Sequence, residues 1–246
     1  MPELPEVETV VRGLNRLILK KKISKVKHDW PKSFPNAPKD VEDFMVGAEI
    51  SKVSRRGKAI ILKLNNEYTL VTHLRMTGQM VYRGEENWGA GHPNEDFLND
   101  LPNKSTRVEI DFEDGTKLFF NDQRKFGYMK LLPDFEVELL PFFQKLGPEP
   151  LEDNFTVEIL KKQLSRKRKS MVKPAILDQS VIAGVGNIYA DEALWRAKIH
   201  PETRIEDLSE SDFVKLHEAI RFVMNKSIEK GGSTDRNYVN ADGSRG

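Results

Sequence analysis

The stretch VEIDFEDGTKLFF, residues 108–120, alternates apolar and polar side chains on both sides of an acidic turn that contains glycine. The alternating apolar residues are Val108, Ile110 and Phe112 before the turn, and Leu118 and Phe120 after it. A period of two is typical of strands that bury one face and expose the other. Glu113-Asp114-Gly115 can turn the chain between two such strands. The stretch therefore predicts an antiparallel β-hairpin.

The same period extends outward from this hairpin, over about residues 23–132. Ile60, Leu62 and Leu64, for example, are separated by single residues. We expect the strands of this region to form an antiparallel two-layer β-sandwich. Residues 82–104, which contain several glycines and prolines, are predicted to be a long surface excursion from it.

The segment before the sandwich has the period of a helix. Its apolar residues recur three or four positions apart and are Val7, Val10, Val11, Leu14, Leu17 and Ile18. This spacing predicts an amphipathic helix that docks one face onto a core. Such a helix would hold the N-terminus of the chain in a fixed place.

The second half of the chain also has a helical period. Residues 133–150 contain prolines and acidic residues and are predicted to be a linker. Beyond it, Ser209 can cap a helix that ends at Gly231-Gly232. The apolar residues of that helix are Phe213, Leu216, Ile220, Val223 and Ile228. We therefore predict an α+β protein of two domains: a β-sandwich with a flanking N-terminal helix over residues 1–132, and a helical domain over residues 151–246.

The composition of the 246-residue chain excludes several classes of protein. The hydrophobic content is 38% and the mean hydropathy is −0.55, and no apolar run approaches the ~20 residues of a membrane span, so we expect no membrane partner. The chain has no cysteine, and its five histidines lack metal-ligand spacing, so we expect neither metal nor cofactor. The net charge is only +1, but residues 161–173 hold seven basic residues and no acidic one. This run indicates either a basic binding face or a solvated helix end.

The first three residues, Met1, Pro2 and Glu3, offer a reactive group. Removal of Met1 before the small Pro2 would leave a secondary amine at the N-terminus. An α-amino group titrates near ~8 and a lysine side chain near ~10.4, so much more of the terminal amine is unprotonated at neutral pH. Pro2 could therefore attack a carbon electrophile and form an iminium, with Glu3 moving protons beside it. By itself, a Met-Pro start is more often only a processing signal.

Motifs along the whole chain add to this observation. They are Pro2 to Glu8 (PELPEVE), Arg55 to Lys58 (RRGK), His73 to Gly78 (HLRMTG), Asp122 to Gly127 (DQRKFG), Leu146 to Leu151 (LGPEPL), Lys173 to Gln179 (KPAILDQ), Ile182 to Leu194 (IAGVGNIYADEAL), and Gly231 to Thr234 with Tyr238. Together, and in this order, they resemble the formamidopyrimidine-DNA glycosylase family (Fpg, also called MutM). Leu4 favours this branch over the related endonuclease VIII branch, which usually has glycine there.

The resemblance implies a base-excision-repair enzyme that removes oxidised purines, chiefly 8-oxoguanine and formamidopyrimidines, and then cleaves the strand as an AP lyase. Pro2 would attack the sugar of a base flipped out of the stack. Glu3 would supply the proton that opens the sugar ring, and Lys58 would contact a phosphate and assist elimination. Glu6 is expected to orient the terminus and not to react. The partner would be damaged double-stranded DNA, bound by a monomer in the cytoplasm, at the nucleoid if the source is bacterial.

The resemblance also implies a set of DNA contacts. Met76, Arg124 and Phe126 match the residues that fill the hole left by the flipped nucleotide, with Phe126 as a wedge and Arg124 facing the opposite base. Gly184 to Asn187 resembles the turn of a helix-two-turn-helix DNA-binding domain, where backbone N–H groups meet phosphate. The further expected DNA-binding residues are His73, Arg107, Lys169, Lys173, Asn187 and Arg236.

The chain departs from the family pattern in three places, one of which is residues 104–107 (KSTR), where the family has a histidine-containing segment. The four-cysteine zinc finger of the family does not occur in these 246 residues, so we expect a weaker grip on DNA and reduced efficiency. Asp235 stands in the lesion-capping loop, where relatives usually carry an apolar residue. Two alternatives therefore stay open: a protein that binds lesions or abasic sites with only residual lyase activity, and an endonuclease VIII-like glycosylase for oxidised pyrimidines.

Overall fold

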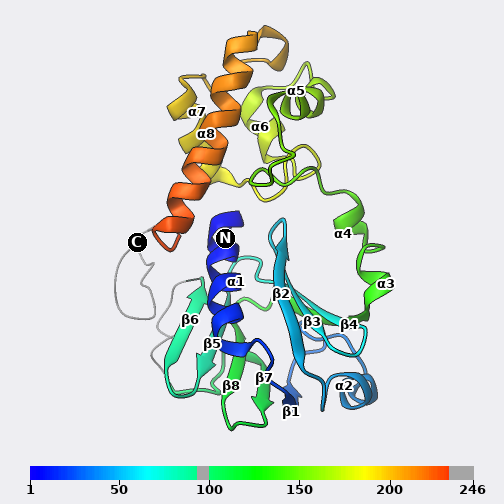
Figure 1. Ribbon diagram of the computed structural model, residues 1–246. Coiled ribbons are helices and arrows are strands. Elements are labelled where there is room, and N and C mark those ends of the chain that lie inside the picture. The colour runs from blue at the N-terminus through cyan, green and yellow to red at the C-terminus, as the bar shows by residue number, and fades with distance from the viewer. Residues whose placement is uncertain (93–99, 233–246) are drawn as a thin grey trace.

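The computed structural model describes residues 1–92 and 100–232. These residues form a β-rich domain and a helical domain (Figure 1). The strands are β1 (Ile23–His28), β2 (Ile50–Arg56), β3 (Ala59–Leu64), β4 (Tyr68–His73), β5 (Gly78–Arg83), β6 (Asn87–Gly91), β7 (Thr106–Phe112), β8 (Lys117–Asp122) and β9 (Tyr128–Pro133). The helices are α1 (Leu4–Ile18), α2 (Pro38–Phe44), α3 (Asp134–Val137), α4 (Pro141–Gln144), α5 (Val157–Ser165), α6 (Val172–Leu177), α7 (Asn187–Ala197) and α8 (Glu210–Glu229), with a 3₁₀ turn at Ile205–Asp207.

The nine strands form two antiparallel sheets. One sheet has the order β1-β7-β8-β5-β6 and the other the order β2-β3-β4-β9. In the predicted hairpin, Val108 of β7 lies opposite Phe120 of β8, and Ile110 lies opposite Leu118. This register puts the alternating apolar residues of both strands on one face. The predicted fold class is thus confirmed.

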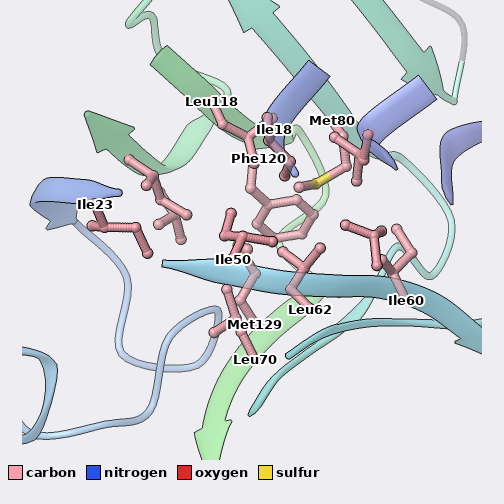
Figure 2. Close-up of a cluster of buried hydrophobic side chains, with 14 of the residues drawn as sticks. Ile18, Ile23, Ile50, Ile60, Leu62, Leu70, Met80, Leu118, Phe120 and Met129 are labelled. Carbon is pink, nitrogen blue, oxygen red and sulfur yellow. The ribbon is translucent and has the colours of Figure 1, made fainter. Parts of the chain in front are cut away.

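The sandwich core lies between the two sheets (Figure 2). Ile50, Ile60, Leu62, Leu70 and Met129 come from the four-stranded sheet, while Met80, Leu118 and Phe120 come from the five-stranded sheet and Ile18 from α1. Nearly all of these side chains are fully buried, and deleting one as large as Phe120 would cost about 3–5 kcal/mol. Such a core provides a rigid support for the loops at its edges.

Strand β6 differs from the sequence prediction, which placed residues 82–104 on a surface excursion. Residues 87–91 instead pair with β5 and lie beside α1 (Figure 1). A Cβ atom on Gly13 of α1 would lie 2.1 Å from the Trp88 ring, so the helix needs a glycine where this strand crosses it. The glycines of residues 89–91 resembled a loop in the sequence, although here they allow close packing.

The predicted linker is also more structured than its prolines and acidic residues indicate. It holds α3 and α4, whose Val137 and Phe143 pack on Val71 and Leu132 of the four-stranded sheet. Pro141 occupies the start of α4, where a missing backbone N–H has no cost. The segment thus runs along the sandwich before it reaches the helical domain.

The helical domain has its own core, built from α5 to α8. Helix α8 begins at the predicted cap, where Ser209 and Asp212 exchange hydrogen bonds in a capping box. Leu4, the first residue of α1, belongs to this second core, while Val7 and later residues of the same helix belong to the sandwich core. One helix therefore joins both domains, and it brings the N-terminus between them (Figure 1). Within residues 1–92 and 100–232, no helix is both long and apolar enough to cross a bilayer.

Candidate active site at the N-terminus

Glu3 is held at the start of helix α7. Its side chain is only 4% exposed, and its two carboxyl oxygens accept hydrogen bonds from the backbone N–H groups of Ile188, at 3.0 Å, and Tyr189, at 3.4 Å. The first N–H groups of a helix have no partner within the helix and attract negative charge. The helical domain thus fixes the carboxyl group that follows Pro2.

The environment of Glu3 favours its protonated form. Burial raises the pKa of this carboxyl, while the Ile188 hydrogen bond and the nearby Lys58 ammonium oppose the rise, and the result is a pKa above the ordinary value. A carboxyl group with a raised pKa keeps its proton closer to neutral pH and can donate it. The site can therefore supply an acid next to Pro2.

Lys58 lies in the tight turn between β2 and β3, directly after Gly57, whose φ is +56°. The side chain is buried, and this burial lowers the pKa of the ammonium group although Glu3 and Glu6 attract it. Lys58 thus lies close enough to Glu3 and Glu6 for their charges to interact. A cation in this place can attract a phosphate group or take part in proton transfer.

A mostly buried carboxylate, Glu149, holds the turn that carries Lys58. It pairs with Arg55 at 2.5 Å and with Arg56 at 2.9 Å, and it accepts the backbone N–H of Gly57 at 2.6 Å. Sequence reasoning found the RRGK and LGPEPL motifs separately and missed this pairing. Their opposite charges were the only available signal that they meet.

Glu6 holds the backbone of the N-terminus. One of its carboxyl oxygens accepts the N–H of Glu3 at 2.8 Å, and the other accepts the Tyr189 hydroxyl. The Tyr189 oxygen also lies 2.6 Å from the hydroxyl oxygen of Ser227. Glu6 therefore lies where an orienting residue is needed. Sequence reasoning missed Tyr189, which stands inside a quoted motif, and Ser227, which no pattern marks.

Two neighbouring loops carry the predicted hole-filling residues. Met76, in the β4–β5 loop, is 40% exposed, and Phe126, in the β8–β9 loop, is 55% exposed. The Arg124 guanidinium lies 5.0 Å from the centre of the Phe126 ring. Asp122 joins the loops because it accepts the Thr77 hydroxyl and the backbone N–H groups of residues 124 and 127. A buried anchor thus supports exposed apolar tips, which suits side chains that enter a duplex.

Two residues of the predicted DNA-binding set are not presented at the surface. Arg107 is only 3% exposed, and it pairs with Asp29 at 2.7 Å and donates to the carbonyls of Lys104 and Ser105. The expected phosphate contact of Arg107 is therefore corrected to a structural role. His73 is also buried, and burial together with Arg75 and Lys58 lowers its pKa to about 3, so its imidazole is neutral at physiological pH.

The remaining predicted DNA contacts belong to the helical domain. Asn187 is exposed at the first position of α7, and Lys169 is exposed before α6. Lys173 is partly exposed and pairs with Asp191 at 2.6 Å. Arg236 lies outside the described residues, as does Asp235.

The described residues do not fit the zinc site of the family. They contain no group of three or more histidine, cysteine, aspartate or glutamate side chains that could hold a metal ion, and the chain has no cysteine. The arrangement around Glu3 and Lys58 consists of carboxyl groups and an ammonium group.

Comparison with known protein families matches both parts of the chain. Residues 1–129 match the family described as the formamidopyrimidine-DNA glycosylase N-terminal domain, and residues 146–238 match its H2TH domain. The Fpg of Ligilactobacillus salivarius is 40% identical over 241 residues, which cover 98% of this chain and 82% of that protein. The Fpg of Desulforamulus reducens is 42% identical over 249 residues, covering 100% and 84%.

Solved structures of similar proteins contain DNA. The complex of Lactococcus lactis Fpg with DNA that contains an abasic site has a TM-score of 0.84 and 33% identity, and the match covers 99% of this chain and 84% of that one. A Lactococcus lactis Fpg variant bound to DNA with Fapy-dG has a TM-score of 0.83 and 34% identity, covering 97% and 83%. MutM bound to DNA with carbocyclic 8-oxo-G has a TM-score of 0.82 and 34% identity, covering 96% and 82%.

Proposed function

Since the chain belongs to the formamidopyrimidine-DNA glycosylase family and is a DNA glycosylase for oxidised purines, we propose that Pro2 excises the base by covalent catalysis and that the same intermediate leads to AP lyase cleavage. The observation that carries this proposal is the placement of Glu3. An acid with a raised pKa lies beside the residue that becomes the N-terminus, in a site anchored by both domains.

The first step is the exchange of one bond at the sugar for another. After Met1 is removed, the nitrogen lone pair of Pro2 forms a bond to C1′ of the flipped nucleotide. The glycosidic bond breaks, and the base leaves with that electron pair and takes up the proton that the Pro2 nitrogen loses. Glu3 gives its proton to the ring oxygen O4′ as the C1′–O4′ bond opens, which leaves an iminium between Pro2 and C1′.

The second step is elimination, which makes the enzyme an AP lyase. The iminium acidifies the C2′ proton, which a water molecule takes up. The electrons of that C–H bond lead to a C2′=C3′ double bond, and the 3′ phosphate leaves C3′ with the electrons of the broken C–O bond. Lys58 would contact a phosphate and stabilise its negative charge. Water then hydrolyses the iminium and returns the free amine of Pro2.

Flipping the nucleotide leaves a hole in the duplex that other groups must fill. Met76 and Phe126 are exposed apolar side chains on two loops that Asp122 joins, so both can enter the stack. Arg124 lies over the Phe126 ring and can donate hydrogen bonds to the acceptors of an unpaired cytosine. Asn187, Lys169 and Lys173 would contact phosphates on the helical domain.

The proposed reaction draws only on groups of the protein, so we propose that it needs no cofactor. Excision in the presence of a metal chelator should then equal excision without it. We further propose that the chain acts as a monomer, on the DNA of the bacterial cytoplasm. Sedimentation of the enzyme with a single-lesion duplex tests the stoichiometry.

Borohydride trapping tests the central proposal. Reduction during the reaction with an abasic or 8-oxoguanine duplex should attach the DNA to the N-terminal peptide, as mass spectrometry can show. The Pro2→Gly variant keeps an α-amine and should retain some lyase activity, whereas Glu3→Gln should lose base excision more than cleavage of preformed abasic sites. An adduct on a lysine side chain would refute the role of Pro2.

A further inference from the structure

A chain of hydrogen bonds connects the N-terminus to the far end of helix α8. It runs from the Glu3 N–H to Glu6, from Glu6 to the Tyr189 hydroxyl, and from there to the Ser227 hydroxyl. Three elements, α1, α7 and α8, each provide one or more of these groups. This series of hydrogen bonds therefore joins parts of the molecule that are remote in the sequence.

The hydroxyl group of Tyr189 is the central link. The tyrosine is only 3% exposed and its ring belongs to the core of the helical domain. A phenylalanine ring could pack in the same place, and a buried hydroxyl stabilises little unless it has partners. Here the hydroxyl forms hydrogen bonds with a carboxyl oxygen and with a second hydroxyl. We therefore infer that the tyrosine serves to make these hydrogen bonds and not only to fill the core.

Ser227 extends the series of hydrogen bonds to the last turn of α8. Its hydroxyl meets Tyr189, while its backbone carbonyl accepts the N–H groups of Lys230, at 3.1 Å, and Gly232, at 2.8 Å. These backbone bonds close the helix where the chain leaves it. The position of the helix end is thereby tied to the Tyr189 hydroxyl.

At its other end, this series of hydrogen bonds holds the Pro2–Glu3 peptide group. This peptide is planar, so the Glu6 bond to the Glu3 N–H fixes the plane to which the Pro2 ring is attached. A nucleophilic amine reacts only from a narrow range of positions, and a displacement of about 1 Å can cost about 100-fold in rate.

We propose that Tyr189 and Ser227 are positioning residues that orient the Pro2 amine through Glu6. The inference rests on the proposed function, because the group they orient is the nucleophile of that reaction. In this role they act on the amine through Glu6 and not on the sugar or the base directly. Their effect belongs to the rate of covalent bond formation and not to the affinity for DNA.

Three variants test this role on an abasic duplex. Tyr189→Phe removes only the hydroxyl, Ser227→Ala removes the next group, and Ser227→Thr keeps a hydroxyl as the matched control. In single-turnover borohydride trapping, Tyr189→Phe should be slower by at least about tenfold and Ser227→Ala by about threefold, while Ser227→Thr stays near the wild-type rate. Binding of a duplex with an uncleavable tetrahydrofuran site should change by less than about twofold in all three.

The double variant Tyr189→Phe/Ser227→Ala should be no slower than Tyr189→Phe alone, since both act through Glu6. A Tyr189→Phe enzyme that traps at the wild-type rate overturns the proposal, as does a loss of affinity equal to the loss of rate. If Tyr189→Phe does not fold, Ser227→Ala against Ser227→Thr decides, because Ser227 is only partly buried. Peptide mapping of the wild-type adduct distinguishes a failure of the positioning role from a failure of the proposed function. An adduct on a residue other than Pro2 refutes the proposed function itself.

Discussion

The carboxyl group of Glu3 fills the space in which a side chain of Gly186 would lie. A Cβ atom placed on Gly186 would be 2.2 Å from the Glu3 Cδ atom, far inside any contact distance. Gly184, two residues earlier with a φ of +85°, is crowded in the same way by Leu4, at 2.6 Å. The turn before α7 therefore needs both glycines because the N-terminal segment lies against it.

Gly186→Ala should displace Glu3 from the α7 N–H groups without abolishing folding. We expect base excision to fall by about 100-fold, since a proton donor that moves by about 1 Å no longer reaches its acceptor. Cleavage of preformed abasic sites, which does not require base loss, should fall less. Single-turnover assays on 8-oxoguanine and abasic duplexes measure the two losses.

Gly115→Ala is the matched control for that variant. Gly115 has a φ of +83° but no atom within 4 Å of an added Cβ, and it lies in the β7–β8 turn. The alanine should cost about 1–2 kcal/mol of stability through backbone strain. Its excision rate should equal that of the wild type, and a similar loss in both variants would contradict the role of the Gly186 contact.

The raised pKa of Glu3 predicts how stability depends on pH. Because the folded state holds this proton more tightly than the unfolded state, the stabilisation is complete below the unfolded pKa of about 4.3 and is lost as pH rises through the higher folded pKa. Glu3→Gln is neutral throughout and can still accept the Ile188 N–H. Its melting temperature should exceed that of the wild type at pH 8, and the difference should shrink toward pH 4.5. A difference that does not vary with pH would contradict this environment.

The Glu149 carboxylate should show the opposite dependence. Burial alone would raise its pKa, but Arg55, the Gly57 N–H and Arg56 lower it overall. Its stabilisation is therefore present above the unfolded pKa of about 4.3 and lost as pH falls through the folded pKa. Glu149→Gln should cost about 3 kcal/mol at pH 7, because Arg56 loses its ion pair and Arg55 keeps only its pair with Glu8, and less at pH 4.

That variant should also slow elimination, because the Lys58 turn loses its anchor. Denaturant titration at the two pH values measures the stability, and cleavage of an abasic duplex measures the elimination. The control is Glu8→Gln, which removes a more exposed partner of Arg55 and should cost less than about 1 kcal/mol. Equal costs in the two variants would contradict the anchoring role of Glu149.

Arg124 should read the base opposite the lesion. A guanidinium can donate to the acceptors of cytosine but fits adenine poorly, so excision of 8-oxoguanine should be faster opposite cytosine than opposite adenine. Arg124→Ala should reduce this preference, while Arg75→Ala on the neighbouring loop should keep it. Unchanged preference in Arg124→Ala would remove the residue from this role.

The Lys173–Asp191 pair should limit phosphate binding by the helical domain. If Lys173 leaves Asp191 to bind a phosphate, Asp191→Asn should tighten DNA binding, and Lys173→Ala should reduce the salt dependence by about 0.9 in slope. Glu210→Gln, which frees Lys161 in the same domain, controls for the change in net charge. DNA affinities measured at several salt concentrations check both expectations. An unchanged dependence of the affinity on salt in Lys173→Ala would exclude a contact between Lys173 and a phosphate.

Local patterns were enough to predict most of the fold. The spacing of Val7 to Ile18, the alternation around Gly115 and the cap at Ser209 each depend on a few adjacent residues, and the structure confirms all three elements. Strand β6 could not be predicted, because Gly91 is explained only by the β5 backbone that lies against it, and Trp88 only by the space that Gly13 of α1 leaves for its ring.

The site was predictable where a single residue carries the chemistry, as Pro2 and Glu3 do, and their catalytic roles stay predictions. It was not predictable where two distant residues meet. Glu149 and Ser227 have no local signal, since their partners are separated from them by dozens of residues. The burial of Arg107 has the same cause: its partner Asp29 belongs to the loop after a neighbouring strand.

The helix shared by the two cores has a consequence for protein engineering. Leu4 fills a place in the helical domain, although it is encoded at the opposite end of the gene. A fragment that contains only the helical domain would expose to water the apolar side chains that Leu4 covers. A fusion at the N-terminus would block the amine that we propose to react. Attempts to split or tag the protein should therefore keep residues 2–18 intact, with Pro2 at the N-terminus, and attach additions elsewhere, for example at the solvent-exposed β7–β8 turn.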